Sequence, residues 1–324
     1  MRAARYFLLA LLAALGIAAF AAPPPDWPTR PVRFIFPFDT GSSADALARA
    51  IARQLSLKWD QPVIVENRPG AGTVIGTDHI AKAAPDGYTF GWATTALAIN
   101  PSLHDKLPYD ASTDLAGVTL IYQLKTVIVV TPGLPVTTVA DLVRWAKEHK
   151  TQVAYTSPGV GTSPHLIAEI FSQRHGLEMQ HVVYKNLGQA NLDVIAGRVP
   201  VMFTTLPSSI ALVDSRQFRL LAVVSDETVA GRPDLPTLAG LLPRETRAGW
   251  NGIVVPARTP RRIVKRLNAD IVNALRAPEV KAILDRMNVE PMTSTPEELD
   301  ALLRAEIPRW AAVIRRAGGR LEQD

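Results

Sequence analysis

Two short loops carry residue types that could bind an anion. Residues 38–43 are Phe-Asp-Thr-Gly-Ser-Ser, and residues 157–163 are Ser-Pro-Gly-Val-Gly-Thr-Ser. Each loop follows an apolar run and precedes a stretch with helical spacing. Exposed N–H groups at a helix N-terminus attract negative charge, and the helix dipole adds to that attraction. The pattern therefore indicates carboxylate binding, although two ordinary strand–helix turns capped by their own serines and threonines would have the same sequence.

Motifs typical of catalysis are missing. The string nearest to a nucleophile elbow is Gly161 to His165, and it places Pro164 directly after Ser163. Proline has no N–H, so it cannot supply the oxyanion-hole donor expected there. The six histidines form no local metal pair, and the absence of cysteine excludes thiolate nucleophiles and zinc–thiolate sites. The glycines at 70, 72 and 76 miss the dinucleotide spacing. We expect no catalytic residue, no metal and no cofactor, with an α/β hydrolase or lyase as the alternative.

Apolar runs and helix-start signals alternate along the chain. Ser42 with Asp45 and Thr138 with Asp141 have the spacing of a capping box. A repeated strand–helix–strand order favours parallel strands covered by helices. The length favours two lobes, which we expect at 22–124 plus 246–324 and at 125–245. Strands are predicted near 32–36, 63–65, 88–93, 127–130, 153–156, 181–184, 201–203, 220–224 and 253–255.

The N-terminal segment has the features of an export signal. Arg2 and Arg5 precede an apolar run over 6–20, and Ala19-Phe20-Ala21 offers a small-x-small cleavage site. The run has about 15 residues, fewer than the ~20 that a bilayer span needs, so a membrane anchor is the less favoured alternative. We expect a signal peptide over 1–21, cleaved near Ala21, and a periplasmic protein. Cleavage would remove two arginines and lower the formal charge from +5 to +3. Lysines and arginines are scattered, so no nucleic-acid partner is expected.

Several longer strings, in order along the chain, point to a family. They are Trp27 to Pro31, Val65 to Gly72, Ala83 to Thr89, Leu107 to Asp110, Ser163 to Leu166, and Trp250 with Gly252. From Trp27 onward the sequence resembles the Bug family of periplasmic substrate-binding proteins, which serve tripartite tricarboxylate transporters. The resemblance implies a two-lobed, type II-like Venus-flytrap α/β fold, each lobe a mainly parallel sheet flanked by helices. It also implies capture of a small organic acid between the lobes without catalysis, and delivery to large and small permease subunits. Presentation of the ligand to a sensor kinase is an alternative.

The resemblance also assigns site residues. Those in the first lobe are Phe38, Asp39, Thr40, Gly41, Ser42, Ser43 and Asp45. Those in the second lobe are Ser157, Thr162, Ser163, His165, Tyr184, Lys185, Thr204, Thr205 and Pro207. Lys185 could pair with a second ligand carboxylate or could simply be solvated.

Some of these positions depart from the family pattern. Asp39, Thr40 and Ser42 stand where the family has Pro, Ala and Gly, and Thr204 stands where it has Asp. Loss of that Asp favours hydroxyl or plain carboxylate ligands over amino acids. Asp39, in contrast, either points to solvent or selects a cationic or hydroxyl group. The sequence leaves both interpretations open. Asn186 replaces a common Gly after Lys185, which leaves the local turn undefined.

Overall fold

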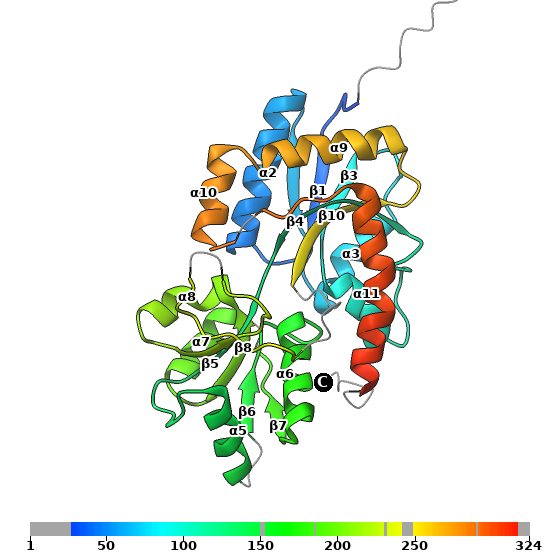
Figure 1. The fold of residues 1–324 in the computed structure, drawn as a ribbon. Helices are drawn as coiled ribbons and strands as arrows, with labels where there is room; N and C mark the ends of the chain where they lie inside the picture. Colours follow the sequence, from blue (N-terminus) through cyan, green and yellow to red (C-terminus); the bar gives the residue numbers. More distant parts are fainter. Residues whose placement is uncertain are drawn as a thin grey trace, which may run out of the picture.

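The computed structural model describes residues 27–149, 153–184, 186–229, 232–241, 249–289 and 291–316. The expected signal peptide, residues 1–21, lies outside this part of the chain. Two sheets lie one above the other, with helices against both (Figure 1). The strands are β1 (Val32–Phe36), β2 (Val63–Asn67), β3 (Thr89–Thr94), β4 (Leu115–Gln123), β5 (Thr126–Val130), β6 (Val153–Thr156), β7 (Met179–His181), β8 (Val201–Thr205), β9 (Arg219–Val223) and β10 (Trp250–Pro256). The helices are α2 (Ser43–Trp59), η1 (Ala71–Thr73), α3 (Val74–Ala81), α4 (Ala96–Leu103), α5 (Val139–Glu148), α6 (Ser163–His175), α7 (Leu187–Ile195), α8 (Leu206–Asp214), α9 (Arg261–Ala274), α10 (Pro278–Arg286) and α11 (Pro296–Arg316).

Each sheet is mixed. The upper sheet has the order β2-β1-β3-β10-β4, and the lower sheet has the order β7-β6-β8-β5-β9. In the upper sheet β1 pairs in parallel with β2 and β3, whereas β10 runs antiparallel to β3 and β4. In the lower sheet β6 pairs in parallel with β7 and β8, whereas β5 runs antiparallel to β8 and β9. The predicted two-lobed α/β fold is confirmed, with about as many antiparallel as parallel pairs in each sheet.

The local sequence explains how the first helix begins. Ser42 has an extended backbone, and its Oγ accepts a hydrogen bond from the N–H of Asp45 at 3.1 Å. Leu47, Ile51 and Leu55 recur every four residues along α2 and are fully buried against the upper sheet. This amphipathic face fixes α2 on the sheet, so the loop that precedes it is held at the carboxyl end of β1.

The sequence did not predict every element correctly. The strand expected over 181–184 ends at His181, because β7 pairs with β6 from Met179↔Val153 to His181↔Tyr155. After that pair, the N–H of Val182 donates to Tyr155 and the chain turns toward α7. Helix α4 was not predicted and contains Pro101, which normally disfavours a helix interior. Strand β4 was also not predicted.

The chain passes between the sheets at two places that lie side by side. β4 leads into β5 through Leu124, and the segment after β9 returns to β10 through Gly249. The N–H of Leu124 donates to the carbonyl oxygen of Gly249 at 2.7 Å. A Cβ added to Gly249, where φ is +77°, would lie 2.0 Å from the carbonyl oxygen of Leu124. The two crossings are therefore packed backbone against backbone.

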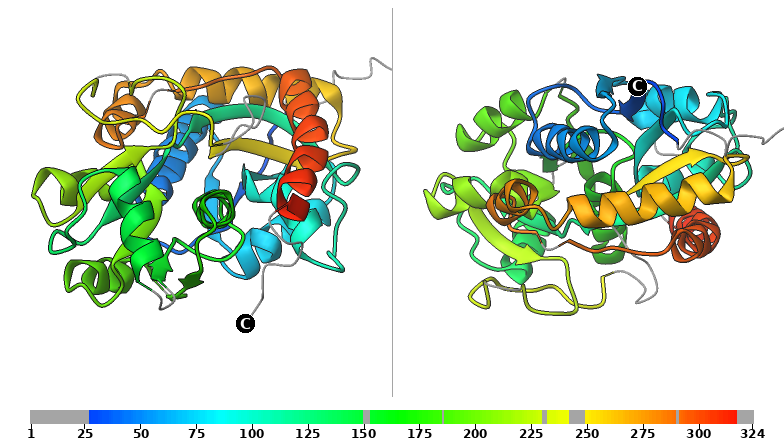
Figure 2. Two further views of the ribbon diagram at one scale, coloured as in Figure 1. Left: turned by 60° about the horizontal axis from the view of Figure 1, so that its bottom comes forward. Right: turned by 90° about the horizontal axis from the view of Figure 1, so that it is seen from above.

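A separate apolar cluster joins the lobes away from these crossings. Trp310 and Ile314 of α11 pack with Ile99 of α4 and Leu166 of α6, and each is at most 3% exposed. Figure 2 shows α11 extending from the upper sheet toward α6. Because α4 and α11 flank the upper sheet and α6 flanks the lower one, these side chains form an interlobe contact.

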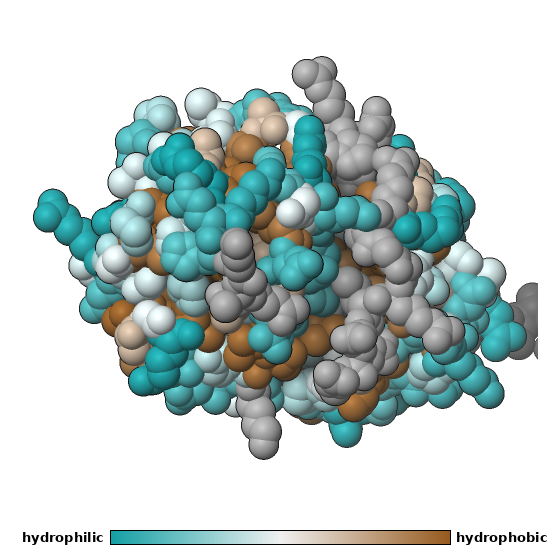
Figure 3. All heavy atoms as spheres, turned by 90° about the horizontal axis from the view of Figure 1, so that it is seen from below, coloured by the Kyte–Doolittle hydropathy of each residue, from teal (hydrophilic) through white to brown (hydrophobic). Residues whose placement is uncertain are grey.

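No helix in the described part of the chain is long and apolar enough to cross a bilayer. The lower face of the molecule has hydrophilic residues around its rim and hydrophobic patches between them (Figure 3).

Candidate functional site

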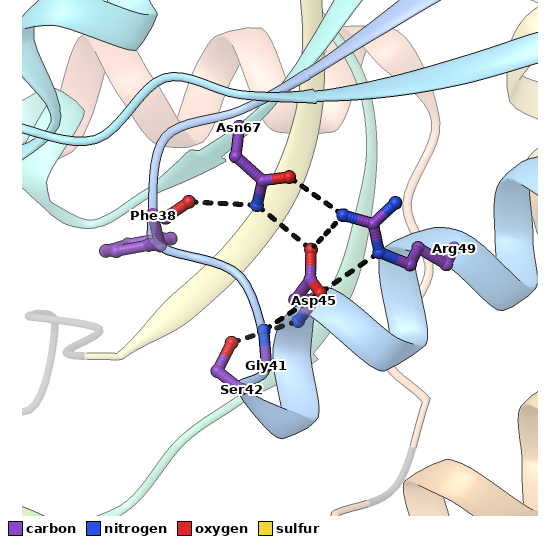
Figure 4. A network of polar contacts seen from close by, with 6 residues as sticks. All are labelled: Phe38, Gly41, Ser42, Asp45, Arg49 and Asn67. Atoms are coloured by element: carbon purple, nitrogen blue, oxygen red, sulfur yellow. Dashed lines mark hydrogen bonds and ion pairs between the residues drawn. The ribbon is translucent and has the colours of Figure 1, made fainter. Parts of the chain in front are cut away.

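The first predicted loop is shaped by a buried carboxylate. Asp45, in the first turn of α2, is 4% exposed and lies among Gly41, Arg49 and Asn67 (Figure 4). Its Oδ2 accepts from the N–H of Gly41 at 3.1 Å and from Nε of Arg49 at 3.0 Å. Its Oδ1 accepts from Nδ2 of Asn67 at 3.0 Å and from Nη2 of Arg49 at 3.1 Å. Both carboxylate oxygens are thus occupied by the protein itself.

These partners keep Asp45 ionised. Burial on its own would raise the pKa of this carboxyl. The hydrogen bonds from Arg49, Asn67 and Gly41 outweigh that effect and hold the pKa below its ordinary value. The same Asn67 also donates to the carbonyl oxygen of Phe38 at 3.0 Å. Asp45 and Asn67 therefore fix both ends of the loop, and Asp45 itself is not directed at solvent.

The rest of this loop is open. Asp39, Thr40 and Ser43 are exposed, and their side chains have no hydrogen-bond partner within the described ranges. Ser42 uses its Oγ to cap Asp45, which leaves the first-turn N–H groups of Ser43 and Ala44 without an acceptor there. Phe38 is half-buried and packs edge-on against Phe36, with ring centroids 5.5 Å apart. The loop thus presents free backbone donors beside a hydroxyl and an aromatic ring.

The second predicted loop is built in a similar way. Ser157 is buried, and its Oγ accepts from the N–H of Gly159 at 3.3 Å. The hydroxyl of Thr162 donates to the carbonyl oxygen of Gly159 at 2.7 Å. It therefore does not cap α6, and Pro164 in the first turn has no N–H. Among the residues described, the N–H groups of Ser163 and His165 have no acceptor.

The imidazole of His165 lies beneath this loop. It is 3% exposed, and its Nδ1 accepts from the N–H of Gly161 at 3.2 Å. Burial, together with the neighbouring His181, lowers the pKa of His165 to about 3. His165 is therefore a neutral internal group that accepts a hydrogen bond from the loop.

The remaining second-lobe predictions fall into different environments. The hydroxyl of Tyr184 donates to Oδ2 of Asp193 on α7 at 2.7 Å, and burial together with this contact raises its pKa to about 12. The hydroxyl of Thr205 is hydrogen-bonded to that of Ser208 at 2.7 Å, and Pro207 lies in the first turn of α8. Thr204 is 1% exposed, and its Oγ1 has no partner in the described part of the chain. Lys185 lies outside the described residues.

The two loops converge on one segment of the upper lobe. Gly76 of α3 packs against Pro37, so that an added Cβ would lie 2.7 Å from the proline Cβ. An added Cβ on Gly72 would lie 3.4 Å from the carbonyl oxygen of Val160, and one on Gly161 would lie 3.6 Å from Oδ1 of Asn100. The η1–α3 segment therefore lies against Pro37, the residue before the first loop, and against Val160 of the second loop.

This arrangement directs two helix N-termini at opposite lobes. α2 begins at the end of β1 that faces the lower lobe (Figure 1), and the loop before α6 contacts α4 of the upper lobe. Neither loop contains a lysine or arginine. An anion between them would be held by backbone amides and hydroxyls. Sequence reasoning missed three supporting residues. Asn67 bonds Phe38 and Asp45 from the end of β2, Arg49 bonds Asp45 from the next turn of α2, and Asn100 donates to the carbonyl oxygen of Gly72.

No group of three or more His, Asp or Glu side chains in the described part could hold a metal ion. A surface hollow of ≈ 340 Å³ lies beside α4 and α11 and is lined in part by His104, Tyr109 and Ile307. None of the predicted site residues lines it.

Comparison with known proteins gives consistent matches. Residues 47–319 match the family described as "Tripartite tricarboxylate transporter family receptor". Protein BugT of Bordetella pertussis is 34% identical over 321 residues, which cover 96% of this chain and 98% of BugT. The structure described as "R. palustris Rpa4515 with adipate" is 33% identical, with a TM-score of 0.82, covering 91% of this chain and 100% of that one. The structure of the periplasmic binding protein BugD is 26% identical, with a TM-score of 0.80 and the same coverage.

Proposed function

The chain belongs to the tripartite tricarboxylate transporter receptor family, and we propose that it is a periplasmic solute-binding protein that holds a small organic carboxylate between its lobes. The family assignment agrees with the Bug-family resemblance seen in the sequence. In this proposal the ligand leaves chemically unchanged and passes to the large and small subunits of a membrane permease. Residues 22–124 with 246–324 form one lobe of the binding unit, and residues 125–245 form the other.

One observation carries the proposal. Within the described residues, the first turns of α2 and α6 each keep unpaired N–H groups. The η1–α3 segment of the upper lobe lies against Pro37, just before the first loop, and against Val160 of the second loop. Charge-assisted hydrogen bonds contribute about 1.5–3 kcal/mol each. Micromolar affinity requires about 8 kcal/mol in total. Four such donors, two from each loop, would contribute about 6–12 kcal/mol, which is of the required order before the cost of association is subtracted.

We assign the predicted residues to two roles. Ser43, Ser163 and the exposed hydroxyl of Thr40 are proposed to contact the ligand. Asp45, His165, Tyr184 and Thr205 are proposed to shape the site, because each is already hydrogen-bonded within its own lobe.

A dicarboxylate is the ligand class that fits best. The two sets of backbone donors lie in different lobes, so each can hold one carboxylate of the same molecule. The relative with adipate is 33% identical to this chain, and the match covers 91% of this chain. The replacement of the family Asp by Thr204 removes a partner for a ligand ammonium and supports an acid without an amino group. We therefore propose a linear dicarboxylate of about four to six carbons.

The experiment is a thermal-shift and calorimetric series with purified protein. Adipate, glutarate and succinate are added separately, with hexanoate and lysine as controls. We expect at least one dicarboxylate to raise the melting temperature and to bind 1:1, because a ligand that prefers the native state stabilises it. NMR of the recovered dicarboxylate should show no new compound. Steady product formation would instead identify an enzyme, and no response to any dicarboxylate would contradict the ligand class.

A further inference from the structure

Two histidines from different elements are stacked beneath the second loop. His165 lies in the first turn of α6, and His181 is the last residue of β7. Their ring centroids are 4.3 Å apart and their planes are inclined by 26°. The ring of Tyr155, on β6, stacks on His181 at 4.9 Å. The three rings are thus stacked beneath the second loop.

Both histidines are hydrogen-bonded to the loop above them. The N–H of Gly161 donates to Nδ1 of His165 at 3.2 Å, and Oγ of Ser157 lies 2.9 Å from Nε2 of His181. A backbone N–H can only donate, so Nδ1 of His165 must carry a lone pair and the ring proton must be on Nε2. The second loop is therefore attached at two points, and the Gly161 N–H is turned away from any ligand.

The groups around the histidines keep them uncharged. His181 on β7 and Tyr155 on β6 face His165 as neutral rings, and burial raises the pKa of Tyr155 far above its ordinary value. The nearest carboxylate, Glu169 on α6, is 4.0 Å from Nε2 of His165 and accepts a hydrogen bond from Tyr155. Burial lowers the pKa of His165 to about 3 and that of His181 to about 4. Protonation at Nδ1 would also place two donors, the ring N–H and the Gly161 N–H, against each other.

We propose that His165 is a positioning residue, a permanently neutral hydrogen-bond acceptor that holds Gly161 inward and leaves the Ser163 and His165 N–H groups as the donors for the ligand. This inference rests on the proposed function. His181 supports it from below by stacking on His165 and bonding Ser157. Carboxylate binding by this loop then does not depend on histidine protonation at neutral pH, although two histidines lie directly beneath the loop.

The test compares two substitutions that differ in the acceptor. His165→Asn keeps an oxygen close to the position of Nδ1, whereas His165→Phe keeps a ring of similar size without an acceptor. We expect adipate to bind His165→Asn within threefold of wild type at pH 7.5. We expect the dissociation constant of His165→Phe to rise at least tenfold. Equal affinity of His165→Phe and wild type, or equal loss in both variants, would overturn the proposal.

A second measurement needs no ligand and no substitution. Long-range ¹H–¹⁵N NMR spectra of wild type should show His165 with its proton on Nε2, unchanged between pH 5 and 8. A titration midpoint inside that interval, or a proton on Nδ1, would overturn the proposal even if adipate binds. If no dicarboxylate binds but the ring is neutral with its proton on Nε2, the proposed function fails while the positioning of Gly161 stands. The two ideas are therefore tested separately.

Discussion

Asn67 at the end of β2 donates from Nδ2 to Oδ1 of Asp45 at the start of α2, over 3.0 Å. The same nitrogen reaches the carbonyl oxygen of Phe38 at 3.0 Å. One amide group thus connects the edge strand, the loop and the first helix of the upper lobe. The geometry of the first loop depends on this contact as much as on its own residues.

Replacement of Asp45 should therefore affect both stability and binding. Asp45→Ala removes the acceptor of Gly41, Arg49 and Asn67, and we expect a loss of about 2–3 kcal/mol in the free energy of unfolding. The loop should also lose its shape, so adipate affinity should fall. Urea denaturation and calorimetry measure the two effects. Asp39→Ala, in the same loop but exposed and without a side-chain hydrogen bond in the described part, is the control and should leave stability within ~0.5 kcal/mol. Similar behaviour of the two variants would contradict the role given to Asp45.

The first-turn N–H of α2 can be removed without removing the helix. Proline is tolerated at the first helical position, and Ser42 already has the extended backbone that a following proline requires (φ −77°, ψ 160°). Ser43→Pro should weaken adipate binding about tenfold or more, since one charge-assisted hydrogen bond is lost. Val139→Pro, at the equivalent position of α5, is the matched control and should bind as wild type. Unchanged affinity of Ser43→Pro would exclude that amide as a ligand donor.

The interlobe cluster offers a test of coupling between the lobes. Leu166→Ala and Leu142→Ala each delete a buried leucine, which typically costs about 2–5 kcal/mol. Leu142 lies in the core of the lower lobe, whereas Leu166 packs against α4 and α11 of the upper lobe. We expect both variants to lose stability and only Leu166→Ala to show weaker adipate binding and a larger radius of gyration in X-ray scattering. Equal binding by both variants would show that this contact does not influence the lobes' arrangement.

The stability of the upper lobe should depend on acid pH through Glu66. Hydrogen bonds from Arg33 and Arg68 outweigh burial and lower the pKa of Glu66 from 4.5 to about 2. A carboxyl whose pKa is lower in the folded state stabilises the fold above pH 4.5, and this contribution is lost as the pH falls toward 2. We expect about 1–2 kcal/mol, because Arg33 is 39% exposed and solvent weakens the pair.

Urea denaturation of Glu66→Gln checks this prediction. The variant should be less stable than wild type at pH 6 and nearly equal to it at pH 2.5. Glu279→Gln, which removes an exposed ion pair with Arg53 at 3.3 Å, should follow the wild-type pH profile. A constant difference between Glu66→Gln and wild type across this range would mean that the carboxyl's ionisation contributes nothing.

Local signals in the sequence were sufficient for the helix starts. Ser42 and Asp45 have capping-box spacing, and the structure places the Asp45 N–H on the Ser42 hydroxyl. The Asp45 carboxylate, however, bonds Gly41, Arg49 and Asn67 rather than the Ser42 backbone. The choice between these partners depends on β2 lying beside β1, which no local pattern encodes.

Pairing between distant strands determined the structural features that the local sequence did not predict. The strand expected over 181–184 stops at His181 because β6 offers partners only as far as Tyr155. That register places the His181 ring on Tyr155 and beneath His165, so the side chain of His165 is supported from the lower sheet. The identities of these residues were visible in the sequence, but their mutual contact was set by sheet assembly.

The contact between Leu124 and Gly249 has a mechanical consequence. Two crossing segments that lie side by side and share a hydrogen bond act as a single hinge between the lobes. Such a hinge permits one lobe to rotate toward the other but resists translation and twisting of the lobes against each other. The length of the bound acid would then set the angle between the two lobes, and every bound acid would close the lobes about the same hinge axis.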